Sequence, residues 1–122
     1  MTKAEKAVNN HKSFYPCSAA VLCAFCDEAG LSEQEARKIA MPFAGGKMGK
    51  CGAVLAADYV LQKHFPEDGA ERAAELERRF TEMNRSVMCR ELKGGLTGQV
   101  LRPCSGCVTD AAELLEEMLE EK

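Results

Sequence analysis

The sequence lacks long apolar runs, an excess of basic residues and histidine-rich motifs, and each absence excludes a class of protein. No run approaches the roughly 18 consecutive apolar residues of a membrane-spanning helix, so we expect no membrane insertion. With 16 Lys and Arg against 19 Asp and Glu, the net charge of −3 argues against a nucleic-acid partner, because phosphate binding needs clustered positive charge. His11 and His64 fit neither a zinc-finger nor a catalytic spacing, and we interpret both as surface residues.

The N-terminal segment MTKAEKAVNNHKSFYP has lysines but neither an apolar core nor a small-residue cleavage site. It therefore lacks the features of a secretory signal, and the sequence predicts a cytoplasmic protein. We expect residues 1–14 to form an N-terminal extension or a short helix. The whole chain, 1–122, is predicted to be a single helical domain, because this length is enough to bury a core.

Seven cysteines are the residues present in unusual number. A domain of this size does not need disulfides to stay folded, and in a reducing cytosol a cysteine set is more often catalytic or metal-binding than structural. The odd count leaves at least one thiol outside any intramolecular pairing. The cysteines therefore direct the search for function.

The apolar pattern predicts an all-α protein, a compact bundle of about five helices. Apolar residues recur three and four positions apart, and no segment alternates like a β-strand. Ser32 and Glu35 have the spacing of a helix-starting capping box. The glycines of segment 43–50, including Gly45 and Gly46, predict a backbone hinge, and residues 90–103 predict a turn-rich connector. The expected helices cover about 16–29, 32–41, 51–61 and 68–88, and a last helix starts near residues 105–109 and runs to the end of the sequence.

Three cysteines, Cys17, Cys51 and Cys107, fall at predicted helix starts. Unpaired amides and the positive end of the helix dipole stabilise a thiolate there, so we expect these thiols to be acidic, Cys107 in particular. If the helix starts pack together, the sulfur atoms converge at one end of the bundle. Cys89 follows a long predicted helix and can reach the same end.

Two pairs of cysteines have the Cys-x-x-Cys spacing. Cys104 and Cys107 flank a helix start after a proline, where the spacing permits a disulfide or shared metal ligation. Cys23 and Cys26 lie inside an apolar helix, and we interpret them as core packing.

The order of Cys17, the loop leading into Cys51-Gly52-Ala53, the phrase Cys89-Arg90-Glu91-Leu92 and Cys107 resembles the redox-active protein family named for the pattern C, GCAxxG, C, C. The resemblance runs from about Cys17 to the C-terminus. It implies a small helical bacterial or archaeal protein. Lys50 and Ala56 stand where we expect the two glycines of the motif. The resemblance implies four family cysteines, Cys17, Cys51, Cys89 and Cys107, with Cys104 as a secondary redox candidate and Gly45, Gly46, Gly52 and Ala53 as supporting residues.

Three functions remain open from the sequence. In the first, the four family cysteines exchange disulfides with a redox partner protein or a small thiol, and Cys51 or Cys107 is the attacking thiolate. In the second, Cys17, Cys51, Cys89 and Cys107 bind an iron–sulfur cluster or zinc. In the third, the chain is a helical interaction domain with structural thiols, or a homodimer formed through the alanine-rich helix that starts at Cys51. No Cys-x-x-Cys-His motif is present, so covalent haem is not expected.

Overall fold

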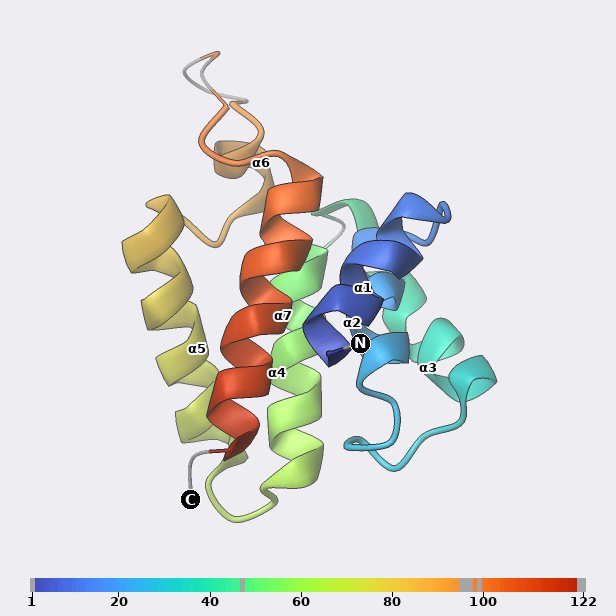
Figure 1. Cartoon of the computed structure of the whole chain (residues 1–122). Helices are drawn as coiled ribbons and strands as arrows, with labels where there is room; N and C mark the ends of the chain where they lie inside the picture. Colours follow the sequence, from blue (N-terminus) through green and yellow to red (C-terminus); the bar gives the residue numbers. More distant parts are fainter. Residues whose placement is uncertain (1, 47, 95–97, 99, 121–122) are drawn as a thin grey trace.

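The computed structural model describes residues 2–46, 48–94, 98 and 100–120, and the chain there is helical (Figure 1). The helices are α1 Lys3–Lys12, α2 Cys17–Ala24, α3 Glu33–Ala40, the 3-10 helix η1 Met41–Gly46, α4 Gly52–His64, α5 Gly69–Asn84, α6 Cys89–Leu92 and α7 Cys104–Glu120. The described ranges contain no β-strand, only the isolated bridge between Lys50 and Met88. The all-α prediction is confirmed. The count of about five helices was too low, because residues 3–12 and 89–92 form helices of their own.

Helix α4 lies at the centre of the packing, in contact with α2, α5, α7 and η1. Its apolar side chains are small, and Ala53, Val54, Ala56 and Ala57 are fully buried. Small side chains let neighbouring helices approach closely, so α4 is covered on its alanine-rich face by the chain itself. Figure 1 shows α4 flanked by α5 and α7. The possible homodimer stays a prediction.

Helix ends follow local chemistry where the sequence carries a signal for it. The predicted capping box opens α3, with the Ser32 hydroxyl accepting from the Glu35 amide at 3.2 Å. Helix α2 ends at Ala24, earlier than predicted, in turns that close at Gly30 with φ +71°. Helix α5 also ends early, because Arg85 adopts a left-handed conformation with φ +73° that the amphipathic pattern does not reveal.

The predicted connector 90–103 is described in part, since residues 95–97 and 99 lie outside the described residues. Its start forms the single turn α6, which lies at the same end of the molecule as the first turn of α7 (Figure 1). The predicted hinge glycines Gly45 and Gly46 belong to η1. Their role as a hinge stays a prediction.

Two backbone hydrogen bonds join the chain before α4 to the chain before α6. The Cys51 amide donates to the Val87 carbonyl at 2.7 Å, and the Cys89 amide donates to the Gly49 carbonyl at 3.0 Å. These bonds place the starts of α4 and α6 next to each other.

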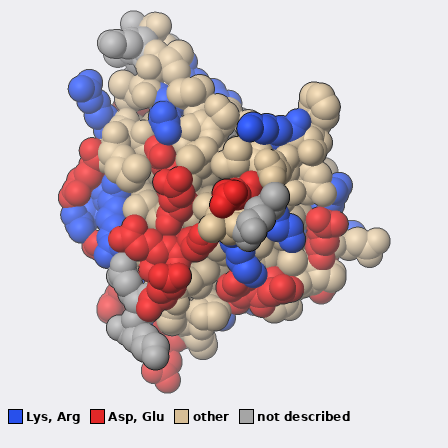
Figure 2. All heavy atoms as spheres, viewed as in Figure 1, with Lys and Arg blue, Asp and Glu red and all other residues tan. Residues whose placement is uncertain are grey.

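The outer surface is unevenly charged. Figure 2 shows acidic side chains gathered over the C-terminal half of α7, where Glu113, Glu116, Glu117 and Glu120 lie. No helix in the described part of the chain is long and apolar enough to cross a bilayer.

Candidate functional site

Cys51 occupies the N-cap of α4 and is only 5% exposed. Its side chain makes no cap hydrogen bond of standard geometry, but the amides of Ala53 and Val54 face the sulfur and favour its thiolate form. Ala53, a motif residue in the sequence prediction, thus contributes through its backbone, while its methyl group packs in the core.

The Cys107 side chain hydrogen-bonds to Cys51, so the two buried sulfurs are neighbours. This bond is the main reason that the pKa of Cys51 falls from the ordinary value of 9.0 to about 6, with help from the Val54 and Ala53 amides and the more distant Lys93 ammonium. Burial opposes the fall but does not outweigh it. The same hydrogen bond, followed by burial, raises the pKa of Cys107.

The prediction that Cys107 is an acidic thiol is therefore wrong. Helix α7 begins at Cys104 rather than near residue 107, so Cys107 lies one turn inside the helix and its own amide already donates to the Pro103 carbonyl. The amides that stabilise negative charge serve Cys51 instead. The pair consists of a Cys51 thiolate and a Cys107 thiol, whose sulfur also lies 3.8 Å from the Arg102 carbonyl.

Cys17, at the start of α2, lies against the first turn of α4. A Cβ atom built on Gly52 would come within 2.8 Å of the Cys17 sulfur and 2.7 Å of the Phe43 carbonyl oxygen, so this contact requires glycine. Counted from Cys51, the family pattern G-C-A-x-x-G covers residues 50–55. The second motif glycine therefore corresponds to Leu55 and not to Ala56, and Gly52 replaces the motif alanine.

We call Cys51 and Cys107 the inner pair. Two half-exposed cysteines, Cys89 and Cys104, lie near them. The Lys93 ammonium hydrogen-bonds to the Cys104 side chain and also to that of Cys89, and these contacts raise the pKa of Lys93. Cys104 therefore lies in the same cluster as the four cysteines of the family pattern. The structure brings the starts of α2, α4, α6 and α7 together, as the helix-start argument anticipated.

An ion pair that the sequence analysis missed fixes the start of α7. The Arg102 guanidinium donates to both carboxylate oxygens of Asp110, at 3.1 and 3.2 Å, and the Asn84 amide donates to the same buried carboxylate at 3.1 Å. Gly106 leaves the room in which the Arg102 side chain lies. The backbone carbonyl of Arg102 also lies next to the Cys107 sulfur, so this network helps to position Cys107 against Cys51. The sequence did offer a signal for this ion pair, because Arg102 and Asp110 carry opposite charges on either side of the Cys104-x-x-Cys107 segment.

Cys23 and Cys26 lie away from this cluster, toward the other end of α2. Cys23 is 1% exposed, its sulfur is 3.9 Å from the Glu33 carbonyl, and burial raises its pKa. This environment matches the packing role expected for it.

A metal centre was the second function left open by the sequence. Seven cysteines are compatible in composition with a metal or cluster. However, the described residues contain no group of three or more His, Cys, Asp or Glu side chains placed to hold a metal ion. Binding of an iron–sulfur cluster or zinc by Cys17, Cys51, Cys89 and Cys107 stays a prediction.

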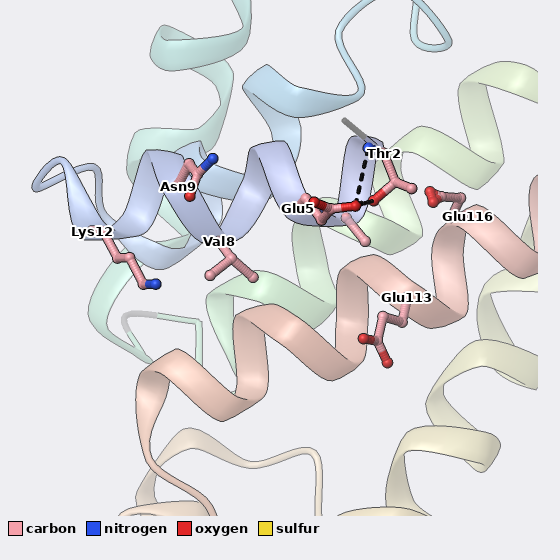
Figure 3. Close-up of a pocket in the computed structure, with 8 residues that line it drawn as sticks. Thr2, Glu5, Val8, Asn9, Lys12, Glu113 and Glu116 are labelled. Atoms are coloured by element: carbon pink, nitrogen blue, oxygen red, sulfur yellow. Dashed lines mark hydrogen bonds between the residues drawn. The ribbon is translucent and has the colours of Figure 1, made fainter.

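Figure 3 shows a groove of about 520 Å³ between α1 and α7, lined by residues that include Thr2, Val8, Lys12 and Glu113. The Thr2 and Glu5 capping box closes one end of it. None of its lining residues is a cysteine, so the groove is separate from the thiol cluster.

Comparison with known proteins gives one match. No curated protein and no solved structure shows significant similarity to the chain. The family model described as "Putative redox-active protein (C_GCAxxG_C_C)" matches residues 15–118, which include all the cysteines of the cluster. By this match over most of its length, the chain belongs to the C_GCAxxG_C_C family.

Proposed function

We propose that the chain is a thiol–disulfide redox protein whose working pair is Cys51 and Cys107. The hydrogen bond between a stabilised Cys51 thiolate and the Cys107 thiol carries this proposal. The thiolate is the nucleophile in disulfide exchange, and its neighbour is already within reach to resolve a mixed disulfide.

The exchange proceeds in two steps. The Cys51 thiolate attacks one sulfur of a partner disulfide, forming a mixed disulfide while the other partner sulfur leaves as a thiolate. Cys107 then attacks the Cys51 sulfur, the second partner sulfur leaves, and the proton of Cys107 passes to a departing thiolate. Two electrons move from the protein to the partner, and with one proton taken from solvent the partner becomes a dithiol.

Burial decides what can reach the inner pair. Cys51 and Cys107 are 5% and 3% exposed, whereas Cys89 and Cys104 are half-exposed beside Lys93. A small disulfide suits direct attack by Cys51. A redox partner protein meets the outer thiols first, and Cys104, one helical turn before Cys107, is placed to pass the exchange inward.

The experiment is disulfide mapping after equilibration in buffers of reduced and oxidised dithiothreitol, with free thiols trapped by alkylation. We expect one disulfide, between the peptides of Cys51 and Cys107. The variants Cys51→Ser and Cys107→Ser should lose it, and Cys26→Ser is the matched control that should keep it. Cys104→Ser should slow exchange with a protein disulfide more than exchange with dithiothreitol.

Other results would reject the proposal. Seven thiols that all resist oxidation would leave an interaction domain with structural thiols. Stoichiometric iron with acid-labile sulfide, or stoichiometric zinc, in anaerobically purified protein would make the cysteines ligands instead.

A further inference from the structure

A second cavity, of about 450 Å³, lies between α4 and α5 and has no cysteine among its lining residues. Phe43 of η1, Lys50, and Asp58 and Tyr59 of α4 line it on one side, and Glu77 lines it from α5. This volume is in the range of small-molecule sites, which combine apolar walls with a few polar groups. Neither the disulfide chemistry nor the family pattern gives this cavity a role.

Asp58 is the unexplained group in this cavity. Asp58 is 8% exposed. Its Oδ1 atom is buried and has no hydrogen-bond partner in the part of the chain that the structure describes. Buried polar atoms in proteins are nearly always hydrogen-bonded, so an orphaned carboxyl oxygen at a cavity wall indicates a missing donor.

The charges around Asp58 define which donor is missing. The protonated Asp58 carboxyl donates to the Glu77 carboxylate, and the Lys50 ammonium is 2.9 and 3.2 Å from the two oxygens of Glu77. Lys50 is therefore engaged with Glu77, and two acidic groups face one cation. The other titratable group on the cavity wall is the Tyr59 phenol, while η1 contributes only the Phe43 ring.

Burial, followed by the hydrogen bond and negative charge of Glu77, raises the pKa of Asp58 to about 10. Asp58 is therefore a neutral acid at pH 7. A second cation beside its Oδ1 atom would allow it to ionise, because the group's charge would then be balanced.

We propose that this cavity binds a small organic cation, a primary ammonium carrying an aromatic or alkyl group, with its N–H donors on the Asp58 carboxylate. The rings of Phe43 and Tyr59, 6.3 Å apart and tilted by 51°, form the wall for the apolar part. An aromatic face also attracts a cation, as Lys63 shows at the same Tyr59 ring, 5.7 Å from its centroid. An anion would instead meet the two carboxyl groups.

Binding and ionisation are linked. The cation displaces the Asp58 proton, so association releases one proton at neutral pH, and the binding constant rises about tenfold per pH unit between about pH 6 and 8. A ligand held by apolar contact alone shows neither effect.

Benzylamine is a suitable probe, with benzyl alcohol as its uncharged counterpart. Calorimetric titration of the full chain in two buffers of different protonation enthalpy measures both affinity and proton release. We expect benzylamine to bind at least tenfold tighter than benzyl alcohol, with release of about one proton. Asp58→Asn should abolish this preference and the proton release, whereas Glu71→Gln, an exposed change on α5, should keep both.

The pH series on the unaltered protein tests the idea independently of any variant. A benzylamine affinity that is flat from pH 6 to 8 would overturn the proposal. So would equal binding of amine and alcohol, absence of saturable binding, or a folded Asp58→Asn protein that binds benzylamine as the unaltered chain does.

Discussion

Replacing Cys107 by alanine should make Cys51 a weaker acid. The Cys107 thiol makes the hydrogen bond that contributes most to the low pKa of Cys51, which is about 6. A hydrogen bond to a charged group contributes about 1.5–3 kcal/mol, and each pKa unit corresponds to about 1.4 kcal/mol. The Cys51 pKa should therefore rise by about 1–2 units in Cys107→Ala, while the amides at the start of α4 maintain the rest of the shift.

The assay is the ultraviolet absorbance of the thiolate as a function of pH, in reduced protein. Burial limits alkylating reagents but not this signal. Cys23→Ala is the matched control, because Cys23 is equally buried but lies near the Glu33 carbonyl and not near Cys51. A Cys51 midpoint in Cys107→Ala that is unchanged or lower would refute the hydrogen bond as the cause of the acidity, and with it the assignment of Cys107 as the resolving thiol.

The remaining predictions concern stability. Because folding lowers the Cys51 pKa from 9.0 to about 6, the reduced protein should gain stability relative to Cys51→Ser as pH rises from 6 to 9, and lose that advantage as pH falls through 6. Urea unfolding of the two proteins should be compared at each pH, because the raised pKa of Asp58 gives both an opposite slope that cancels in the difference. Gly52→Ala should destabilise the fold by about 1–3 kcal/mol, since its methyl group would collide with Cys17; an unchanged thermal midpoint would contradict the close contact. Asp110→Asn should cost about 1–3 kcal/mol in urea unfolding by weakening the bonds to Arg102, and a neutral effect would show that the ion pair does not hold the start of α7.

The helical class and the meeting of the helix starts could be predicted, because both depend on local signals. Apolar residues three and four apart specify helices, and Ser32 with Glu35 specifies the start of α3. Pro16 and the glycine-rich loop similarly mark the starts that carry Cys17 and Cys51.

The acid–base roles of the thiols could not be predicted in the same way. Helix α7 starts at Cys104, before the predicted start, so Cys107 lies inside the helix rather than at its end, and its pKa depends on a contact with Cys51, far away in the sequence. The burial of Asp58 has the same origin, since tertiary packing rather than local pattern sets it. Contacts between residues far apart in the sequence leave no periodic pattern from which they could be predicted.

The neighbouring positions of Cys51 and Cys107 also link oxidation to the lifetime of the folded chain. A disulfide between them would close a loop of about 57 residues, and the loss of chain entropy from the unfolded state would stabilise the fold by about 4 kcal/mol. By the same thermodynamic cycle, the folded chain would hold that disulfide more strongly than the unfolded chain by an equal free energy. Proteases that capture unfolded molecules would then remove the reduced form faster than the oxidised form, so the abundance of the protein would follow the redox state around it.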